Sequence, residues 1–509
     1  MSSDPAVLTE SRSIFPTTMS TVVAPMHQCL DIPEILFLIC EIPAITHLWA
    51  SHRCLAPLIR CMPSDLWVEE DDSKLIFRRA IRETDWERYD IYASKIIQLG
   101  EKLQGGLSLL RLRDAHSTVF MSLAAYRPLH SLLPNLRNFR CTGCNSGILP
   151  SIQGFIEHKL VNVVVDSADM YDEHGTYYPF NPLDLDILFS SLPRLSPYIR
   201  RLYFRIKDST VTRAIPFDIL GNLRHLVELK MYGEIPPAVL NYIASIPSLE
   251  SFHTPRLSLS HIGSFTANQN LFPNLRYFSF VAIGVPYLSI VEMFNSMQCR
   301  FLLLGCIFEG HLMSLAEFGF LVASLHRHSC RTSLNALTLS FKCLTGQPTI
   351  SLPTIENFRP LPSFPSLKSL EIHTIALDNA WLKELAQALP HLERLFVPAH
   401  IAEKPKVTLE GITPLIKLCP ELSDLRITLI AHPIPLATLD GIFNNSIKTI
   451  ILDHSTITQS KKVFRSLIRM FPHLTNVKVY EARNLYTAEE NMTYKMRWYR
   501  INRLLRETC

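Results

Sequence analysis

The sequence is poor in glycine and nearly neutral in charge, and both features exclude classes of function. Its 509 residues contain 17 Gly against 34 Pro, and neither GxGxxG nor GxxxxGK[ST] occurs, which argues against loops that bind nucleotide phosphates. A formal net charge of +4 gives no case for a concentrated basic face, so nucleic acid is not an expected partner. Nucleophile-elbow, HExxH and kinase motifs are also missing. The sequence therefore predicts a protein that is not an enzyme and uses no cofactor.

Long apolar runs are missing as well. No uncharged apolar stretch reaches the roughly 20 residues that a membrane-spanning helix needs. The first residues lack the basic and then apolar segments of a secretory signal. The 12 Cys are scattered along the chain. We therefore expect free thiols in a reducing compartment, the cytoplasm or the nucleus, and no membrane partner.

Two groups of Cys and His residues invite comparison with metal sites. Cys141 and Cys144 form one CxxC pair, but no second pair exists to complete a Cys₄ zinc site. Their register favours structural roles, with Cys141 inside a strand and Cys144 in the turn after it. His326, His328 and Cys330 lie at a polar helix end, where their side chains would not converge. We predict no metal site, and a metal- or thiol-dependent hydrolase is the least favoured alternative.

The clearest positive feature is an internal repeat. Each copy has an apolar residue, two variable residues, an apolar residue, one variable residue and a last apolar residue, written LxxLxL. Successive copies are mostly 23 to 30 residues apart, and helix-period segments that end before a Pro lie between several of them. The copies begin at Leu136, Leu160, Ile199, Leu226, Leu249, Leu275, Leu334, Leu367, Leu392, Leu422, Ile447 and Leu474, with a weaker copy at Phe301.

A period in the twenties with LxxLxL is typical of leucine-rich repeats, which pair one short strand with one helix. We therefore predict an α/β solenoid of horseshoe type, with parallel strands on its concave face and helices on its convex face. A doubly wound α/β domain is the alternative, but it would have longer and less uniform strands.

The variable positions of the repeat point into the concavity or toward solvent, so they are the candidate contacts for a protein substrate. Their mixed charges and aromatic rings suit a protein better than a phosphate backbone. The candidates are Arg137, Arg140, Lys230, Arg276, Tyr277, Lys368, Glu371, Arg394, Phe396, Asp424, Arg426, Lys448 and Lys478.

The segment before the repeats has a different character. "LDIPEILFLICEI" (30–42) predicts a short helix with Pro33 in its first turn and Glu34 at the favourable N-terminal end. "HLWASHRCLAPLIRCMPSDLW" (47–67) predicts two further short helices. About forty residues cannot bury a core alone, so this unit must dock on the solenoid or on a partner.

These segments resemble the F-box. "LDIPEILFLICEI" is similar to its first helix, and "HRCLAPL" with "DLW" to its closing part. The stretch "LIFRRAIRETDWERYDIYASKIIQL" (75–99) resembles the "F…DWxRFxxYAxRVRxL" segment that joins F-box to repeats in a large family of basidiomycete fungal F-box proteins. Here the loop and second helix of the F-box are shortened to "EIPAITHLWASH".

This resemblance implies a non-catalytic substrate receptor of an SCF-type ubiquitin ligase. The F-box would bind a Skp1-like adaptor and through it a cullin, and the repeats would bind the protein to be ubiquitylated. An alternative is a scaffold without a ligase, whose N-terminal helices only cap the solenoid. The residues that the resemblance assigns to Skp1 binding are Leu30, Ile32, Pro33, Glu34, Ile35, Leu36, Leu38, Ile39, Leu58, Leu66 and Trp67.

The predicted organisation follows from these assignments. We expect a disordered tail at 1–25, an F-box-like unit at 26–72, a linker and N-terminal cap at 73–130, repeats at 131–483 and a capping helix at 484–509. In that last helix, Met492, Met496, Tyr499 and Leu504 share one side, while basic residues lie mostly elsewhere. A cap of the last repeat is the favoured interpretation, and binding to acidic lipid or nucleic acid is the alternative.

Overall fold

A computed structural model provides the structure of the chain. The structure describes residues 50–52, 54–70, 74–100, 115–127, 131–142, 149–166, 182–205, 217–232, 237–257, 271–283, 285, 287–297, 299–309, 315–342, 361–373, 377–398, 404–480 and 487–508. The chain divides into two compact units, 1–51 and 52–509. Since nearly all described residues belong to the second unit, the description below concerns that unit.

One long sheet of 15 strands runs through the second unit, and its neighbouring strands are parallel wherever the register is defined. Its order follows the chain: β1 (Ser51–His52), β4 (Gln98–Leu99), β5 (Asn138–Thr142), β6 (Asn162–Asp166), β7 (Arg201–Arg205), β8 (Glu228–Tyr232), β9 (Ser251–Leu257), β10 (Tyr277–Ile283), β11 (Leu303–Glu309), β12 (Ala336–Lys342), β13 (Ser369–Ile372), β14 (Arg394–Val397), β15 (Asp424–Ile427), β17 (Thr449–Ile451) and β19 (Asn476–Lys478). This confirms the predicted solenoid.

The repeat pattern explains where the strands are. In every copy of LxxLxL, the weaker one at Phe301 included, a strand begins at the third position, two residues after the first apolar residue. The three apolar positions of each copy are buried, with Val479 alone only half-buried. Replacing one such leucine by alanine typically costs about 2–5 kcal/mol of stability. The sheet is therefore held by the same apolar positions that define the repeat.

The sheet also extends beyond the predicted start of the repeats. β4 pairs with β5, and the Gly100 N–H donates to the His52 carbonyl at 2.8 Å. Both β1, which contains His52, and β4 lie before residue 131. The sequence analysis places β1 in the F-box-like unit and β4 in the linker. The N-terminal end of the solenoid is thus built partly from the segment that resembles an F-box.

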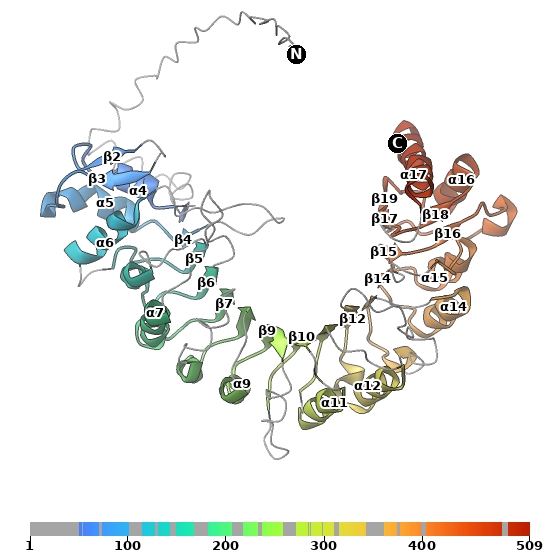
Figure 1. The fold of residues 1–509 in the computed structure, drawn as a ribbon, viewed down its shortest axis with the longest axis horizontal. Helices are drawn as coiled ribbons and strands as arrows, with labels where there is room; N and C mark the ends of the chain where they lie inside the picture. The colour runs from blue at the N-terminus through green and yellow to red at the C-terminus, as the bar shows by residue number, and fades with distance from the viewer. Residues whose placement is uncertain are drawn as a thin grey trace, which may run out of the picture. The chain divides into compact units, whose positions relative to one another are not determined.

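Helices pack along one side of the sheet, and Figure 1 shows them opposite the strands within this unit. The α-helices are α4 (Ala56–Arg60), α5 (Trp86–Ala93), α6 (Ser117–Tyr126), α7 (Pro182–Leu195), α9 (Pro237–Ala244), α11 (Tyr287–Ser296), α12 (Leu315–Arg327), α14 (Asn379–Ala388), α15 (Thr413–Leu418), α16 (Ser460–Met470) and α17 (Ala488–Thr508). In several repeats a 3₁₀-helix serves instead: η3 (Leu149–Phe155), η4 (Phe217–Asn222), η6 (Leu361–Ser363) and η8 (Leu436–Leu439).

Further short elements complete the described fold. They are η1 (Glu83–Asp85), η5 (Ser329–Thr332), η7 (Glu410–Ile412), the antiparallel pair β2 (Trp67–Glu69) and β3 (Leu75–Phe77), and the parallel pair β16 (Ile430–Ala431) and β18 (Thr456–Ile457). The β2–β3 pair is a difference from the sequence-based expectation, which placed Leu66 and Trp67 at the end of a helix. No described helix is long and apolar enough to cross a membrane.

A phenylalanine cluster fills the middle of the solenoid. Its rings touch across repeat boundaries: the Phe252 and Phe278 centroids are 5.9 Å apart, and those of Phe278 and Phe301 are 6.0 Å apart. All rings of the cluster are buried. The members are Phe252, Phe272, Phe278, Phe280, Phe294 and Phe301.

The last helix, α17, packs through a face that the sequence analysis did not select. Trp498, Ile501 and Leu505 are buried, and the Trp498 indole N–H donates to the Ser455 carbonyl at 2.9 Å. Met492 and Met496, in contrast, are 57% and 58% exposed. The side that carries the two methionines therefore faces outward.

The cysteines require one correction. Cys141 is buried at the third apolar position of its repeat, as predicted, but it is disulfide-bonded rather than free. Its partner lies outside the described residues. The expectation of free thiols rests on the expected reducing compartment. A disulfide also requires the fold to bring two cysteines close together, and composition does not show this. Four buried cysteines of the described part of the chain are free: Cys299, Cys306, Cys330 and Cys419.

Candidate functional site

The face of the sheet opposite the helices carries polar side chains, and we call it the open face. Alternation along each strand creates it, because successive side chains point to opposite sides. In β5, Phe139 and Cys141 are buried, while Asn138 and Arg140 are half-buried. The third and fifth positions of every copy thus form two rows that run across the strands.

The predicted contact residues fall into two geometric classes. Nine lie in strands, at the third or fifth position, and belong to the open face: Arg140, Lys230, Tyr277, Glu371, Arg394, Phe396, Asp424, Arg426 and Lys478. The other four lie at the second position, just before a strand, and their side chains are exposed: Arg137, Arg276, Lys368 and Lys448. Sequence reasoning did not separate these classes.

The second-position residues have a backbone role. The Arg137 carbonyl accepts hydrogen bonds from the N–H groups of Val161 and Asn162, at 2.9 and 3.0 Å. The Lys368 carbonyl accepts in the same way from Glu393 and Arg394. These residues begin the hydrogen-bonded ladder at the edge of the sheet, so their side chains border the open face rather than line it.

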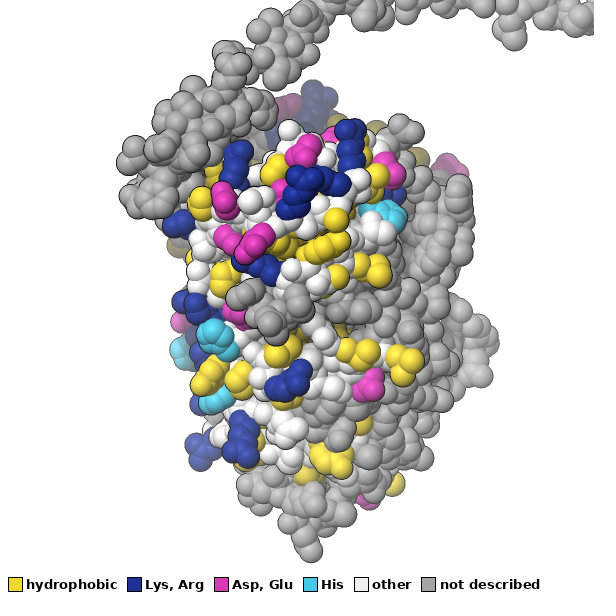
Figure 2. All heavy atoms as spheres, turned by 90° about the vertical axis from the view of Figure 1, so that its left-hand side faces the viewer, with side chains coloured by type: hydrophobic (Ala, Val, Ile, Leu, Met, Phe, Trp, Pro, Cys, Tyr) yellow, Lys and Arg dark blue, Asp and Glu magenta, His cyan; other side chains and the backbone are white. Residues whose placement is uncertain are grey.

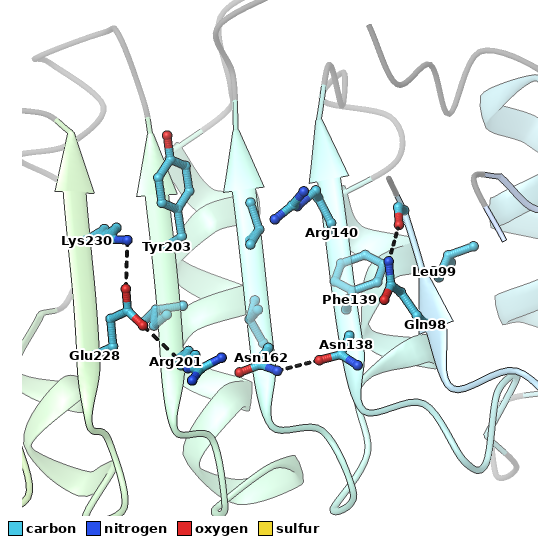
Figure 3. A pocket seen from close by; sticks show the side chains of 14 residues that line it. Gln98, Leu99, Asn138, Phe139, Arg140, Asn162, Arg201, Tyr203, Glu228 and Lys230 are labelled. Carbon is cyan, nitrogen blue, oxygen red and sulfur yellow. Dashed lines mark hydrogen bonds and ion pairs between the residues drawn. The ribbon is translucent and has the colours of Figure 1, made fainter. Parts of the chain in front are cut away.

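The open face is hollowed over its N-terminal strands. A hollow of about 460 Å³ extends over β4 to β8. Figure 3 shows Arg140 extending from β5 toward β6, with Tyr203 on β7 and Lys230 on β8. The lining residues are Gln98, Leu99, Gly100, Asn138, Phe139, Arg140, Asn162, Val163, Val164, Arg201, Leu202, Tyr203, Glu228 and Lys230.

Charged groups meet at the β7–β8 side of this hollow. The Glu228 carboxylate pairs with Lys230 Nζ at 2.7 Å and lies 3.4 Å from Arg201 Nε. Burial lowers the pKa of the Arg140 guanidinium and raises the pKa of the Tyr203 phenol to about 12. The Tyr203 hydroxyl therefore keeps its proton at physiological pH and can donate a hydrogen bond.

Aromatic rings continue from the hollow along the open face. The Tyr203 and Tyr232 ring centroids are 5.3 Å apart, and those of Tyr232 and His253 are 5.0 Å apart. Burial, and secondly the charge of Lys230, lower the pKa of His253, which favours its neutral form. Beside this row, Arg205 Nε donates to the buried Asp166 carboxylate at 2.6 Å.

The sequence analysis missed several residues of the hollow. Asn162, Arg201 and Tyr203 occupy the third and fifth positions of the copies at Leu160 and Ile199, and Gln98 belongs to a strand outside the pattern. The repeat rule itself would have selected the first three, because Tyr203 is at the fifth position, like Arg140 and Lys230, and the other two are at the third position, like Tyr277 and Arg394. Gln98 had no signal of this kind.

The C-terminal part of the open face is paired internally. Lys368 Nζ lies 2.7 Å from Glu393, and His373 Nε2 lies 2.5 Å from Glu371. The hydrogen bond with His373 lowers the pKa of Glu371, although burial opposes this shift. These charges largely satisfy one another.

Arg426 is the centre of a second group on this part of the face. It pairs with the buried Asp453, and its guanidinium lies 5.6 Å from the Tyr480 ring centroid. One Asp453 oxygen, Oδ1, is buried without a hydrogen-bond partner. Asp453 therefore depends strongly on Arg426.

The residues assigned to Skp1 binding fall in two groups. Leu58 and Leu66 are 1% and 0% exposed, so the chain itself already covers them, and Trp67 is half-buried with its indole N–H donating to Met62 O at 3.3 Å. The remaining residues lie outside the described part of the chain: Leu30, Ile32, Pro33, Glu34, Ile35, Leu36, Leu38 and Ile39.

The "DWERYDIYA" segment has a clear structural role. Asp85 is buried and accepts hydrogen bonds from Arg79 Nη1 at 2.6 Å and from the Arg82 N–H at 2.7 Å. The Trp86 ring lies 4.7 Å below the Arg127 guanidinium, which also pairs with Asp90. Figure 2 faces this end and shows acidic and basic side chains interleaved on its described surface. The segment thus stabilises the N-terminal end of the solenoid.

The His-rich helix end is also structural. His328 Nε2 lies 2.8 Å from the Met297 carbonyl, and its Nδ1 accepts from the Cys330 N–H at 3.1 Å. Both ring nitrogens are therefore engaged within the chain. Among the described residues, no group of three or more His, Cys, Asp or Glu side chains is placed to hold a metal ion.

Comparison with known proteins gives fold-level similarity only. No family model and no curated protein matches the chain. A leucine-rich-repeat protein of Leptospira interrogans is 12% identical over 72% of this chain and 89% of its own, with a TM-score of 0.35. The plant peptide hormone receptor RGFR1, solved with RGF2, is 11% identical over 76% of this chain and 71% of its own, with a TM-score of 0.27.

A third structure, TLR13 in complex with ssRNA13, is 13% identical over 81% of this chain and 65% of its own, with a TM-score of 0.34. At such scores the fold assignment rests on the chain's own strands, register and repeat pattern. On those grounds, residues 52–509 form a leucine-rich-repeat solenoid.

Proposed function

We propose that this chain is a non-catalytic adaptor that binds a partner protein on its open face and delivers it to an SCF-type ubiquitin ligase. The hollow over β4 to β8 is the observation that carries the first half of the proposal. It combines polar donors, aromatic rings and a concave shape, which are the features of a protein-binding surface.

The second half rests on the N-terminal sequence. The resemblance of residues 30–67 and 75–99 to F-box proteins supports a Skp1-like partner, with the helix expected at 30–42 as its contact. An adaptor of this kind performs no chemistry, because holding the substrate beside the charged E2 raises its effective concentration.

One observation favours a second candidate function, a scaffold without a ligase. Leu58 and Leu66 are buried by the chain itself, and β4 is a strand of the solenoid sheet. The closing part of the F-box-like segment therefore serves as an end cap, which a pure scaffold also needs. The two candidates share the open face and differ only in whether residues 30–42 bind a Skp1-like partner.

Co-expression with Skp1 separates them. We expect Skp1 to copurify with the full chain, and the double variant Pro33→Ala with Ile35→Asp to lose it without a change in melting temperature. Ile97→Asp is the matched control, because Ile97 is 40% exposed and lies on the solenoid. If wild type fails to retain Skp1, or if Ile97→Asp loses it equally, the ligase half of the proposal is wrong and the scaffold remains.

A further inference from the structure

The hollow on the open face has an unequal charge balance among its lining residues. Arg140, Arg201 and Lys230 are cationic, and Glu228 is the one carboxylate among the described residues that line it. Glu228 is shared between Lys230 and Arg201. Asp166, beside the hollow, also acts electrostatically on Arg140 and pairs with Arg205. With these two residues counted, cations still outnumber carboxylates around the hollow, and a ligand with carboxylate groups would neutralise the excess.

The hollow also contains one acceptor that has no donor, on Asn162. Asn162 Oδ1 is buried without a hydrogen-bond partner, while its amide Nδ2 donates to Asn138 (Figure 3). An unpaired buried acceptor is unfavourable, so a ligand N–H that reaches this oxygen would be favoured. A ligand that bears both carboxylates and N–H groups fits this combination, and an acidic peptide bears both.

The register gives the size of the ligand. Arg140, Val164, Tyr203 and Lys230 lie in one row on four successive strands. Neighbouring strands are about 4.8 Å apart, so the row from Arg140 to Lys230 spans about 14 Å. An extended peptide rises about 3.3 Å per residue, so residues i and i+4 are about 13 Å apart. Two acidic side chains at this spacing match the two ends of the row.

We propose that the hollow binds an extended acidic segment of the partner protein, with carboxylates about four residues apart that meet Arg140 at one end and Lys230 at the other. Tyr203 and Val164 form the floor between them. The inference rests on the proposed binding function of the open face. A phosphate backbone fits less well, because its phosphate groups carry no N–H donor for the Asn162 oxygen.

Peptide binding to the full chain tests this proposal. The probes are fluorescein-labelled ten-residue Gly/Ser peptides with two glutamates at i and i+4, with two adjacent glutamates, or with two glutamines, and binding is measured by fluorescence anisotropy. We expect the i,i+4 glutamate peptide to bind most tightly. Arg140→Gln and Lys230→Gln should each weaken it about tenfold, as the loss of one charge-assisted hydrogen bond predicts.

Lys478→Gln is the matched control, because Lys478 occupies the same repeat position at the other end of the sheet. Its affinity for the peptide should equal that of wild type, and all variants should keep the wild-type melting temperature. Equal binding of all three peptides, equal loss with Lys478→Gln, or no binding at about 1 mM peptide (about −4 kcal/mol) would overturn the acidic-segment proposal.

Two further experiments distinguish a failure of this inference from a failure of the proposed function on which it rests. If a labelled oligouridine of equal charge binds more tightly than the peptide and loses affinity with Arg140→Gln, the ligand is a nucleic acid and the inference is wrong. If Val164→Arg abolishes capture of the protein partner while no acidic peptide binds, the open face binds a partner of other chemistry. In that case the proposed function stands and the acidic-segment proposal fails.

Discussion

The two ends of the open face use similar residue types differently. Over β4 to β8, Arg140, Arg201 and Lys230 surround a hollow with one carboxylate. Over β13 to β19, several cations pair with anions of the chain, as in Lys368–Glu393 and Arg426–Asp453. The N-terminal end thus offers net positive charge and space to a ligand, whereas several charges at the C-terminal end are paired within the chain.

This difference shows that residue type alone does not mark a binding surface. Lys230 and Lys478 stand at the same repeat position, yet only Lys230 lines the large hollow. The two ends differ in how their charged side chains are paired and in whether the open face is hollowed around them. Four experiments with variants test this difference between the two ends.

The largest expected effect is on stability at the C-terminal end. Arg426→Met leaves the 3% exposed Asp453 side chain without its ion pair, and we expect a loss of about 2–3 kcal/mol in the free energy of unfolding, because the arginine is itself partly exposed. Arg205→Met at the N-terminal end should cost less, because Asp166 has further interactions within the chain.

Urea titration of both variants measures these losses, and hydrogen exchange localises them to β15 and β17 or to β6 and β7. Equal losses in the two variants would contradict the difference that we draw between the ends.

The next effect is on partner binding. Val164→Arg places a long cation in the hollow, and Ile451→Arg makes the same change at the same repeat position of the other end, where both wild-type residues are half-buried. We expect Val164→Arg to weaken binding of the protein partner at least about tenfold, or about 1.4 kcal/mol, and Ile451→Arg to leave it unchanged. Titration calorimetry with the purified partner gives both values; the reverse result would place the binding surface at the C-terminal end.

A smaller effect is expected in the pH dependence of stability. The His373 hydrogen bond lowers the folded-state pKa of Glu371 below its ordinary value of 4.5. Its contribution is therefore present above the unfolded-state pKa and is lost as the pH falls through the lower folded-state pKa. Glu371→Gln should remove less than about 1 kcal/mol at neutral pH and flatten the acid limb of stability. Melting temperatures from pH 7 to pH 3 test this, and an unchanged acid limb would refute the pairing.

The smallest effect is expected for Lys368→Gln. Its ion pair with Glu393 lies on the surface, where solvent and salt screen the interaction. We expect the same melting temperature as wild type in low and in high salt. A clear loss in low salt would mean that the C-terminal pairs act as a coupled network.

The strands of the repeats could be predicted from the sequence because one pattern sets both burial and register. Leu136, Phe139 and Cys141, for example, appear in the motif and are buried in the structure. β1 and β4 could not be predicted, since two-residue strands carry no periodic signal. Their pairing is imposed by the neighbouring strand rather than by their own residues.

The candidate site was less accessible to sequence reasoning. Arg140 and Lys230 lie on the open face, whereas Lys368 and Lys448, which the sequence analysis grouped with them, precede their strands. The hollow depends on Tyr203 and Asn162, whose importance comes from the depth of the face and from an unpaired oxygen. The depth of the face and the pairing of this oxygen depend on how neighbouring strands pack, so the sequence pattern does not reveal them.

The phenylalanine cluster of β9 to β11 has a consequence for the order of folding. In a solenoid each repeat is stabilised mainly by its neighbours, and the ring contacts from Phe252 through Phe278 to Phe301 join three successive repeats. These rings therefore couple three repeats directly. Structure would nucleate in the centre and grow toward both ends, so that the hollow forms only after its supporting strands have propagated outward.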